Sequence, residues 1–126
     1  MKFPPHLTVK GGHLHLGTQD CVSLAEKYGT PLYVTSEDRI CEHFTAYRAA
    51  LSKRYEKVQV LFAAKANGNL AVMRALAKLG AGADVFSAGE LALALEAGMP
   101  AEKLLFNGSS KTPTDHGPPD CSGCRG

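Results

Sequence analysis

Residues 58–67 have the sequence Val58-Gln-Val-Leu-Phe-Ala-Ala-Lys-Ala-Asn67, and this stretch decides the fold. Of the seven residues before Lys65, only Gln59 is polar, which is typical of a buried strand in a parallel sheet. The alanines on both sides of Lys65 leave room beside its amine for a flat group. Burial of the amine would favour its neutral form, which is the form that attacks a carbonyl carbon. The alternative is that Lys65 is simply the first solvated residue after the strand.

Alternating helices and strands are predicted after this stretch. Asn69 is a suitable N-cap for a helix, and Gly80 stands where a left-handed residue commonly ends one. The apolar positions of this helix are Leu70, Met73, Leu76, Ala77 and Leu79. A strand over 83–87, a helix over 89–97 that Gly98 and Pro100 stop, and a strand over 103–107 complete the series.

Strands that alternate with helices through short connections are typical of an α/β fold with a parallel sheet. The carboxyl ends of the strands form the edge where such folds bind ligands. Lys65, Asp84 and the run Asn107-Gly108-Ser109 all lie at predicted strand ends. We therefore expect an amine and a carboxylate at one edge of the sheet.

Four motifs in order carry a resemblance to a known family. They are Tyr28-Gly-Thr-Pro-Leu-Tyr-Val-Thr-Ser36, Leu61-Phe-Ala-Ala-Lys-Ala-Asn67, Gly82-Ala-Asp-Val-Phe-Ser-Ala-Gly-Glu-Leu91 and Lys103-Leu-Leu-Phe-Asn-Gly-Ser-Ser-Lys-Thr112. Residues 5–115 resemble the start of a fold-type III pyridoxal-phosphate decarboxylase. The first motif is similar to the segment before the barrel in the diaminopimelate decarboxylases in particular.

The resemblance assigns roles to three residues. Lys65 matches the Schiff-base lysine that holds pyridoxal 5'-phosphate, and Asp84 matches an aspartate beside that cofactor. Glu90 matches a glutamate near the same mouth. A turn or strand-start residue is the alternative for Asp84, and a solvated helix position is the alternative for Glu90.

The resemblance also implies an activity. We expect pyridoxal-phosphate-dependent decarboxylation of an amino acid as small-molecule substrate, with conversion of meso-diaminopimelate to lysine preferred, in lysine biosynthesis. Full-length members of the family are expected to be homodimers. The alternatives are an ornithine- or arginine-type decarboxylase and a non-catalytic pyridoxal-phosphate-binding protein.

The length of 126 residues limits how much of such an enzyme is present. A complete (β/α)8 barrel needs about 250 residues, so we expect the N-terminal part of a TIM-type barrel that is inactive alone. Residues 21–115 are assigned to the partial barrel, and residues 1–20 to a β hairpin of the family's second, β-rich domain. Residues 116–126 have no apolar residue other than cysteine, and we predict an irregular, non-native tail.

Composition and charge exclude other classes. A net charge of +2 without a basic run predicts no nucleic-acid partner. We find no signal peptide and no membrane span, and expect a cytoplasmic protein. We predict no metal site, because neither His6, His13 and His15 nor the single pair Cys121 and Cys124 follows a metal-ligand pattern. Cys21 and Cys41 are expected to be free thiols.

The first half of the chain carries four further predicted elements. They are a hairpin over 6–16 around Gly11-Gly12, a helix over 22–28, a strand over 32–34, and a helix that Ser36 caps and that runs to about Tyr55. The charged face of the last helix, which includes Arg48, is predicted to be plain solvent-exposed surface.

Overall fold

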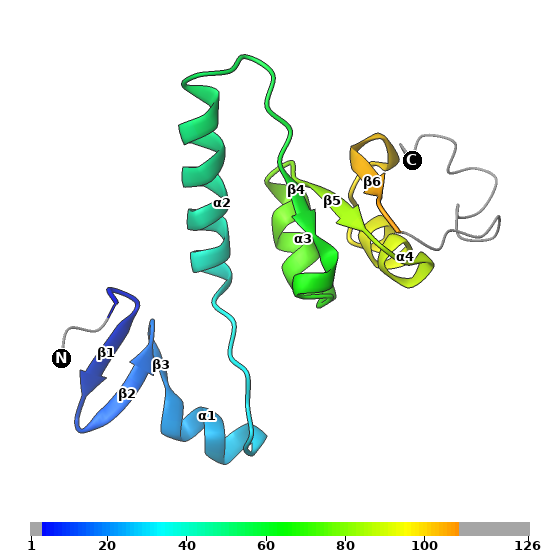
Figure 1. Cartoon of the computed structure of the whole chain (residues 1–126). Coiled ribbons are helices and arrows are strands. Elements are labelled where there is room, and N and C mark those ends of the chain that lie inside the picture. The colour runs from blue at the N-terminus through cyan, green and yellow to red at the C-terminus, as the bar shows by residue number, and fades with distance from the viewer. Residues whose placement is uncertain (1–3, 109–126) are drawn as a thin grey trace. The chain divides into compact units, whose positions relative to one another are not determined.

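A computed structural model describes residues 4–108 of the chain (Figure 1). The chain divides into two compact units, Met1–Arg39 and Ile40–Gly126. Predictions for Ser109 and for the tail at 116–126 fall outside the described residues. None of the helices formed by residues 4–108 is long and apolar enough to cross a membrane.

The first unit contains the predicted hairpin. Its elements are β1 (Leu7–Lys10), β2 (His13–Leu16), β3 (Gln19–Asp20) and α1 (Cys21–Tyr28). Strand β1 pairs antiparallel with β2 across the two-residue turn Gly11-Gly12, whose φ angles are 58° and 84°. Two positive φ angles are what such a tight hairpin requires, and glycine adopts them without strain. The short β3 beside β2 was not predicted.

The predicted strand at Leu32–Val34 is wrong. The structure has no strand there, and the three side chains are 40%, 98% and 46% exposed. Leu, Tyr and Val favour a pleated, half-buried surface. No described strand pairs with this segment, so the preference of its residues for strand is not realised.

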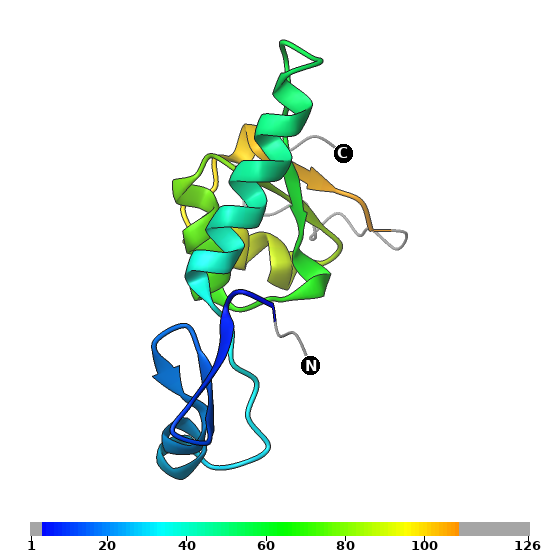
Figure 2. The same cartoon turned by 90° about the vertical axis from the view of Figure 1, so that its left-hand side faces the viewer.

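The second unit holds the parallel sheet. Its elements are most of α2 (Glu37–Ser52), then β4 (Leu61–Ala63), η1 (Ala64–Ala66), α3 (Leu70–Lys78), β5 (Gly82–Val85), α4 (Ala88–Glu96), η2 (Ala101–Lys103) and β6 (Leu104–Phe106). The strand order is β4-β5-β6, and both pairings are parallel (Figures 1 and 2). This arrangement confirms the α/β class and the predicted order of strands and helices.

Helix α3 begins as its sequence predicts, and both crossover helices end before the predicted glycines. The Asn69 side chain accepts a hydrogen bond from the Ala71 N–H, and so caps α3. Gly80 and Gly98 follow α3 and α4 with φ angles of 85° and 87°. After α3, the N–H groups of Gly80 and Ala81 donate to carbonyls of the last helical turn at 2.9 and 3.1 Å. This paired bonding is a Schellman motif, in which glycine is favoured because its φ is positive.

The hydrophobic core lies on one face of the sheet. Ala83 and Val85 of β5 are completely buried and belong to one cluster with residues of α3 and α4. The cluster contains, among others, Val72, Met73, Leu76, Leu91, Ala94, Leu104 and Phe106. On the other face, Ala63, Asp84 and Leu105 are neighbours in register and are only half-buried.

Strand β4 is shorter and less buried than we predicted. Only Leu61–Ala63 form it, and all three residues are half-buried. Its described hydrogen-bonding partner is β5 alone. A strand at the edge of a sheet is covered less than a central one, which explains the difference.

Helix α2 begins where predicted and ends three residues early, at Ser52. The Ser36 hydroxyl accepts a hydrogen bond from the Arg39 N–H at 3.4 Å, as an N-cap does. Ile40 and Phe44, one helical turn apart, pack against the core cluster of the second unit. Figure 2 shows the helix in front of the other elements of this unit.

Candidate functional site at the carboxyl ends of the strands

Lys65 lies directly after β4, in the short 3-10 helix η1. The Asn67 N–H donates to the Ala64 carbonyl at 3.2 Å, and the Asn67 side chain accepts from the Asn69 N–H at 3.0 Å. Asn69 in turn caps α3. Two consecutive side-chain bonds therefore fix the connection from β4 to α3 and hold the Lys65 backbone at the carboxyl end of the strand.

The Lys65 side chain is exposed, contrary to our expectation that the amine would be shielded from water. Its neighbour Ala64 is 1% exposed and fills the core side of the turn. Because β4 is an edge strand, the side of the turn that carries Lys65 stays open. The Lys65 Nζ lies 4.3 Å from the centroid of the Phe86 ring.

Asp84 lies one residue before the end of β5, side by side with Ala63 of β4 and Leu105 of β6. Its side chain is therefore on the half-buried face of the sheet, because the adjacent Ala83 and Val85 point into the core. The Asp84 Oδ1 is buried, and no donor from residues 4–108 lies within hydrogen-bond distance of it. A buried carboxylate oxygen without a donor is costly, and such atoms in native proteins usually accept from a bound group or water.

Glu90 is held at the start of α4 and is not a fully solvated helix position. The side chain is half-buried, and its Oε2 accepts a hydrogen bond from the Phe86 N–H at 2.8 Å. The Ser87 hydroxyl accepts from the Glu90 N–H at 3.2 Å. This reciprocal arrangement resembles a capping box at the start of α4. The sequence Ser-x-x-Glu at 87–90 was the signal that would have predicted it.

The end of β6 completes this edge of the sheet. The Asn107 N–H donates to the Val85 carbonyl at 2.8 Å and so extends the pairing with β5. A Cβ atom at Gly108 would lie 2.8 Å from the Phe86 carbonyl oxygen. Only glycine allows the backbone to pass this close to Phe86. The end of β6 therefore lies beside the end of β5 at the predicted edge of the sheet.

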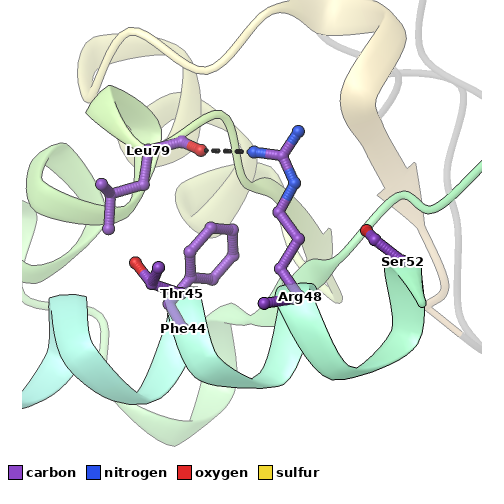
Figure 3. Close-up of a pocket in the computed structure, with 6 residues that line it drawn as sticks. Phe44, Thr45, Arg48, Ser52 and Leu79 are labelled. Atoms are coloured by element: carbon purple, nitrogen blue, oxygen red, sulfur yellow. Dashed lines mark hydrogen bonds between the residues drawn. The ribbon is translucent and has the colours of Figure 1, made fainter.

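A pocket of about 360 Å³ lies elsewhere in the second unit, between α2 and the end of α3 (Figure 3). Its lining includes Phe44, Arg48 and Leu79, and none of the predicted site residues. The Arg48 Nη1 donates to the Leu79 carbonyl at 3.1 Å, and the Lys103 Nζ donates to the Gly80 carbonyl at 3.3 Å. Arg48 is exposed, as predicted, and its side chain also bonds to the end of α3, which was not predicted. Two cations satisfy carbonyls at the negative end of the α3 dipole.

Two of the histidines considered as metal ligands have other partners. The His13 Nδ1 lies 2.9 Å from the Asp20 Oδ2, and the His15 Nδ1 is 3.2 Å from the His13 carbonyl. The bond to Asp20 raises the pKa of His13 and lowers that of Asp20. Asp20 also caps α1 by accepting from the Val22 N–H at 2.9 Å. Within the described part of the chain, no group of three or more potential ligands could hold a metal ion.

The chain is similar to pyridoxal-dependent decarboxylases. A family model described as "Pyridoxal-dependent decarboxylase, pyridoxal binding domain" matches residues 37–115. The diaminopimelate decarboxylase of Methanocaldococcus jannaschii is 47% identical over 109 residues, which cover 82% of this chain and 25% of that protein. The enzyme of the same name from Methanothermobacter thermautotrophicus is 48% identical over 108 residues, with 86% and 25% covered. The chain thus spans about a quarter of the length of these relatives.

Solved structures of pyridoxal-dependent decarboxylases are also similar to this chain. The crystal structure of the M. jannaschii diaminopimelate decarboxylase with L-lysine matches with a TM-score of 0.78 and 43% identity, over 86% of this chain and 26% of that one. A lysine/ornithine decarboxylase from Vibrio vulnificus, complexed with putrescine, matches with a TM-score of 0.64 and 26% identity, over 75% and 25%. Both the TM-score and the sequence identity are higher for the diaminopimelate decarboxylase than for the lysine/ornithine decarboxylase.

Proposed function

The chain belongs to the pyridoxal-dependent decarboxylases through their pyridoxal-binding domain, and on this premise we propose that it is part of a diaminopimelate decarboxylase. The reaction would remove one carboxylate of meso-diaminopimelate as carbon dioxide and leave lysine. The preference for this substrate rests on 43% identity to the solved M. jannaschii diaminopimelate decarboxylase, against 26% to the solved lysine/ornithine enzyme. An ornithine- or arginine-type activity is the weaker candidate on the same grounds.

Lys65 is proposed to carry the cofactor. When bound, pyridoxal 5'-phosphate supplies an aldehyde that condenses with an amine and a ring that withdraws the electron pair left by the departing carboxylate. The observation that carries the proposal is the placement of Lys65, whose exposed amine stands at the carboxyl end of β4. An exposed amine in this position is accessible to an aldehyde, and after substrate has displaced it the amine is available to move a proton.

Asp84 is proposed to contact the same cofactor. Its buried Oδ1 lacks a donor among residues 4–108, and its side chain lies on the sheet face that the helices leave half-buried. A carboxylate there can accept a hydrogen bond from a bound group or stabilise a positive charge on it. The residues present therefore fit a cofactor that brings a donor or a cationic group to this face.

Residues 21–115 are proposed to form part of a (β/α)8 barrel, with residues 1–20 contributed to a second, β-rich domain. The parallel order β4-β5-β6, with α3 and α4 on one face, supports the first assignment. The antiparallel order β1-β2-β3 supports the second. We also propose a homodimer in the cytoplasm. The free thiols Cys21 and Cys41 support a reducing compartment.

The test is to locate the cofactor on the chain. The 126-residue protein is incubated with pyridoxal 5'-phosphate and reduced with borohydride, and the modified lysines are mapped by mass spectrometry. Lys78 serves as the reference because it is an exposed lysine in the last turn of α3. We expect modification mainly at Lys65, lost in Lys65→Ala and unchanged at Lys65 in Lys78→Ala. Equal modification of Lys65 and Lys78 would contradict the proposal.

We expect no measurable release of carbon dioxide from meso-diaminopimelate by the 126-residue chain itself. The described strands form a sheet with two open edges and not a closed barrel. Such a sheet encloses neither the cofactor nor the substrate, and exclusion of water is part of how these sites work. Release of carbon dioxide by this chain would contradict the expectation. If Lys65→Ala abolished that release, a closed barrel would not be needed for the reaction.

A further inference from the structure

The contact between Lys65 and Phe86 joins two of the strand ends described above. The Lys65 Nζ lies 4.3 Å from the Phe86 ring centroid, within the distance over which a ring face attracts an ammonium group. An exposed lysine side chain without such a contact samples many rotamers. The ring therefore favours those rotamers that keep the amine above the end of β5.

The Phe86 backbone is held on two sides. Its N–H donates to the Glu90 Oε2 at 2.8 Å, and Ser87 fixes Glu90 by accepting the Glu90 N–H. On the other side, Gly108 passes so close that an added Cβ would lie 2.8 Å from the Phe86 carbonyl oxygen. The residue before Phe86, Val85, is completely buried in the core. Phe86 is thus a fixed platform, although its side chain is only half-buried.

Phe86 also lies on the side of the sheet that carries the unpaired carboxylate. Phe86 directly follows β5 and comes two residues after Asp84, with the buried Val85 between them. Alternation along a strand places such side chains on the same face. An amine held over Phe86 is therefore kept toward the face that carries the Asp84 Oδ1.

We propose that Phe86 is a positioning residue for the Lys65 amine, and that Glu90 acts through the Phe86 backbone. The inference rests on the proposed role of Lys65 in binding pyridoxal 5'-phosphate. The ring attracts the amine in its charged form only, since a neutral amine has no net charge to interact with the ring quadrupole. The contact therefore keeps the nitrogen at the end of β5, and the nitrogen attacks an aldehyde carbonyl only in its neutral form.

The first measurement is made without cofactor. A ring below the amine shifts the resonances of the Lys65 ε-methylene protons upfield through its ring current. We expect this shift in the native chain and in Phe86→Tyr, and its loss in Phe86→Leu, which keeps an apolar side chain. Backbone amide spectra show whether each variant is folded. A native chain with no upfield shift at Lys65 overturns the proposal without any variant.

The second measurement is the ratio of cofactor fixed by borohydride at Lys65 to that at Lys78. We expect the ratio to fall in Phe86→Leu, because the amine then loses the contact that keeps it at the end of β5. Phe86→Tyr should keep the native ratio. Glu90→Ala should lower the ratio, and Glu90→Gln, which retains an acceptor for the Phe86 N–H, should restore it.

A native ratio in folded Phe86→Leu contradicts the positioning role and leaves the proposed function intact. A native chain without preference for Lys65 contradicts the proposed function, while the ring-current shift still tests the contact.

Discussion

Replacement of Gly82 by alanine should destabilise the second unit strongly, because this glycine lies in the central strand with no space beside it. A Cβ atom at Gly82 would lie 2.0 Å from the Lys103 carbonyl oxygen and 2.7 Å from the Leu61 Cδ2. The Leu61 methyl is the end of a flexible side chain and can turn away. The Lys103 oxygen belongs to the backbone, directly before β6. The clash can therefore be relieved only by moving one strand against the other.

The size of the required movement sets the size of the effect. Ordinary van der Waals contact with a Cβ begins at 3.4 Å, so the backbones must separate by about 1.4 Å. A separation of that size lengthens hydrogen bonds between β5 and β6 beyond their usual limit of about 3.2 Å. Overpacked sites cost about 1–3 kcal/mol, and each lost hydrogen bond about 1 kcal/mol. We expect Gly82→Ala to lower the free energy of unfolding by about 3 kcal/mol.

Gly89→Ala makes the same chemical change where there is space. Gly89 is in the first turn of α4, and the nearest heavy atom to an added Cβ, the Ser87 Oγ, is 3.9 Å away. Alanine favours the helix over glycine, and we expect a gain of about 0.5 kcal/mol. Urea denaturation followed by circular dichroism gives both values, and the midpoint of Gly82→Ala should fall by at least about 1 M. A Gly82→Ala chain as stable as the native one would refute the packing of β5 against β6.

Three further predictions concern other parts of the chain. Met73→Ala should cost about 2–5 kcal/mol in urea denaturation, because Met73 is completely buried in the core and the change leaves a cavity. Arg48→Ala should cost about 0.5–1 kcal/mol by the same method, through loss of the bond to Leu79 and of the dipole interaction. The third prediction concerns the bond between His13 and Asp20, which raises the pKa of the histidine from 6.5 and lowers the pKa of the aspartate from 3.8. The bond between His13 and Asp20 contributes fully to the stability of the fold only between pH 3.8 and pH 6.5. It is lost as the pH rises through the raised pKa of His13 or falls through the lowered pKa of Asp20. NMR titration of the His13 ring should show a lower midpoint in Asp20→Asn, and an unchanged midpoint would disprove the pairing.

Local rules predicted the elements that are determined by neighbouring residues. The side chain of Asn69 caps α3, and Gly80 ends the helix with a positive φ, since both features depend on a few consecutive residues. The turn at Gly11-Gly12 was predictable for the same reason. The order of strands and helices followed from hydrophobic periodicity, and so did the parallel sheet.

Features that depend on distant residues were not predicted. Leu32–Val34 have the composition of a strand and lack a described partner. The exposure of Lys65 depends on what covers the end of β4, which no local pattern reveals. Arg48 reaches a carbonyl 31 residues away at Leu79. The contact of Lys65 with Phe86 likewise joins residues that follow two different strands, and the paired register of β4 and β5 brings them together.

The central claim is that the cofactor binds where the strands of the parallel sheet end, at Lys65. Titration of the isotopically labelled 126-residue chain with pyridoxal 5'-phosphate, followed residue by residue by NMR, tests it most directly. We predict that the largest shifts occur at Lys65 and Ala66 and at Asp84 to Ser87. Largest shifts at Phe44, Arg48 and Leu79, which line the pocket of Figure 3, would contradict the claim.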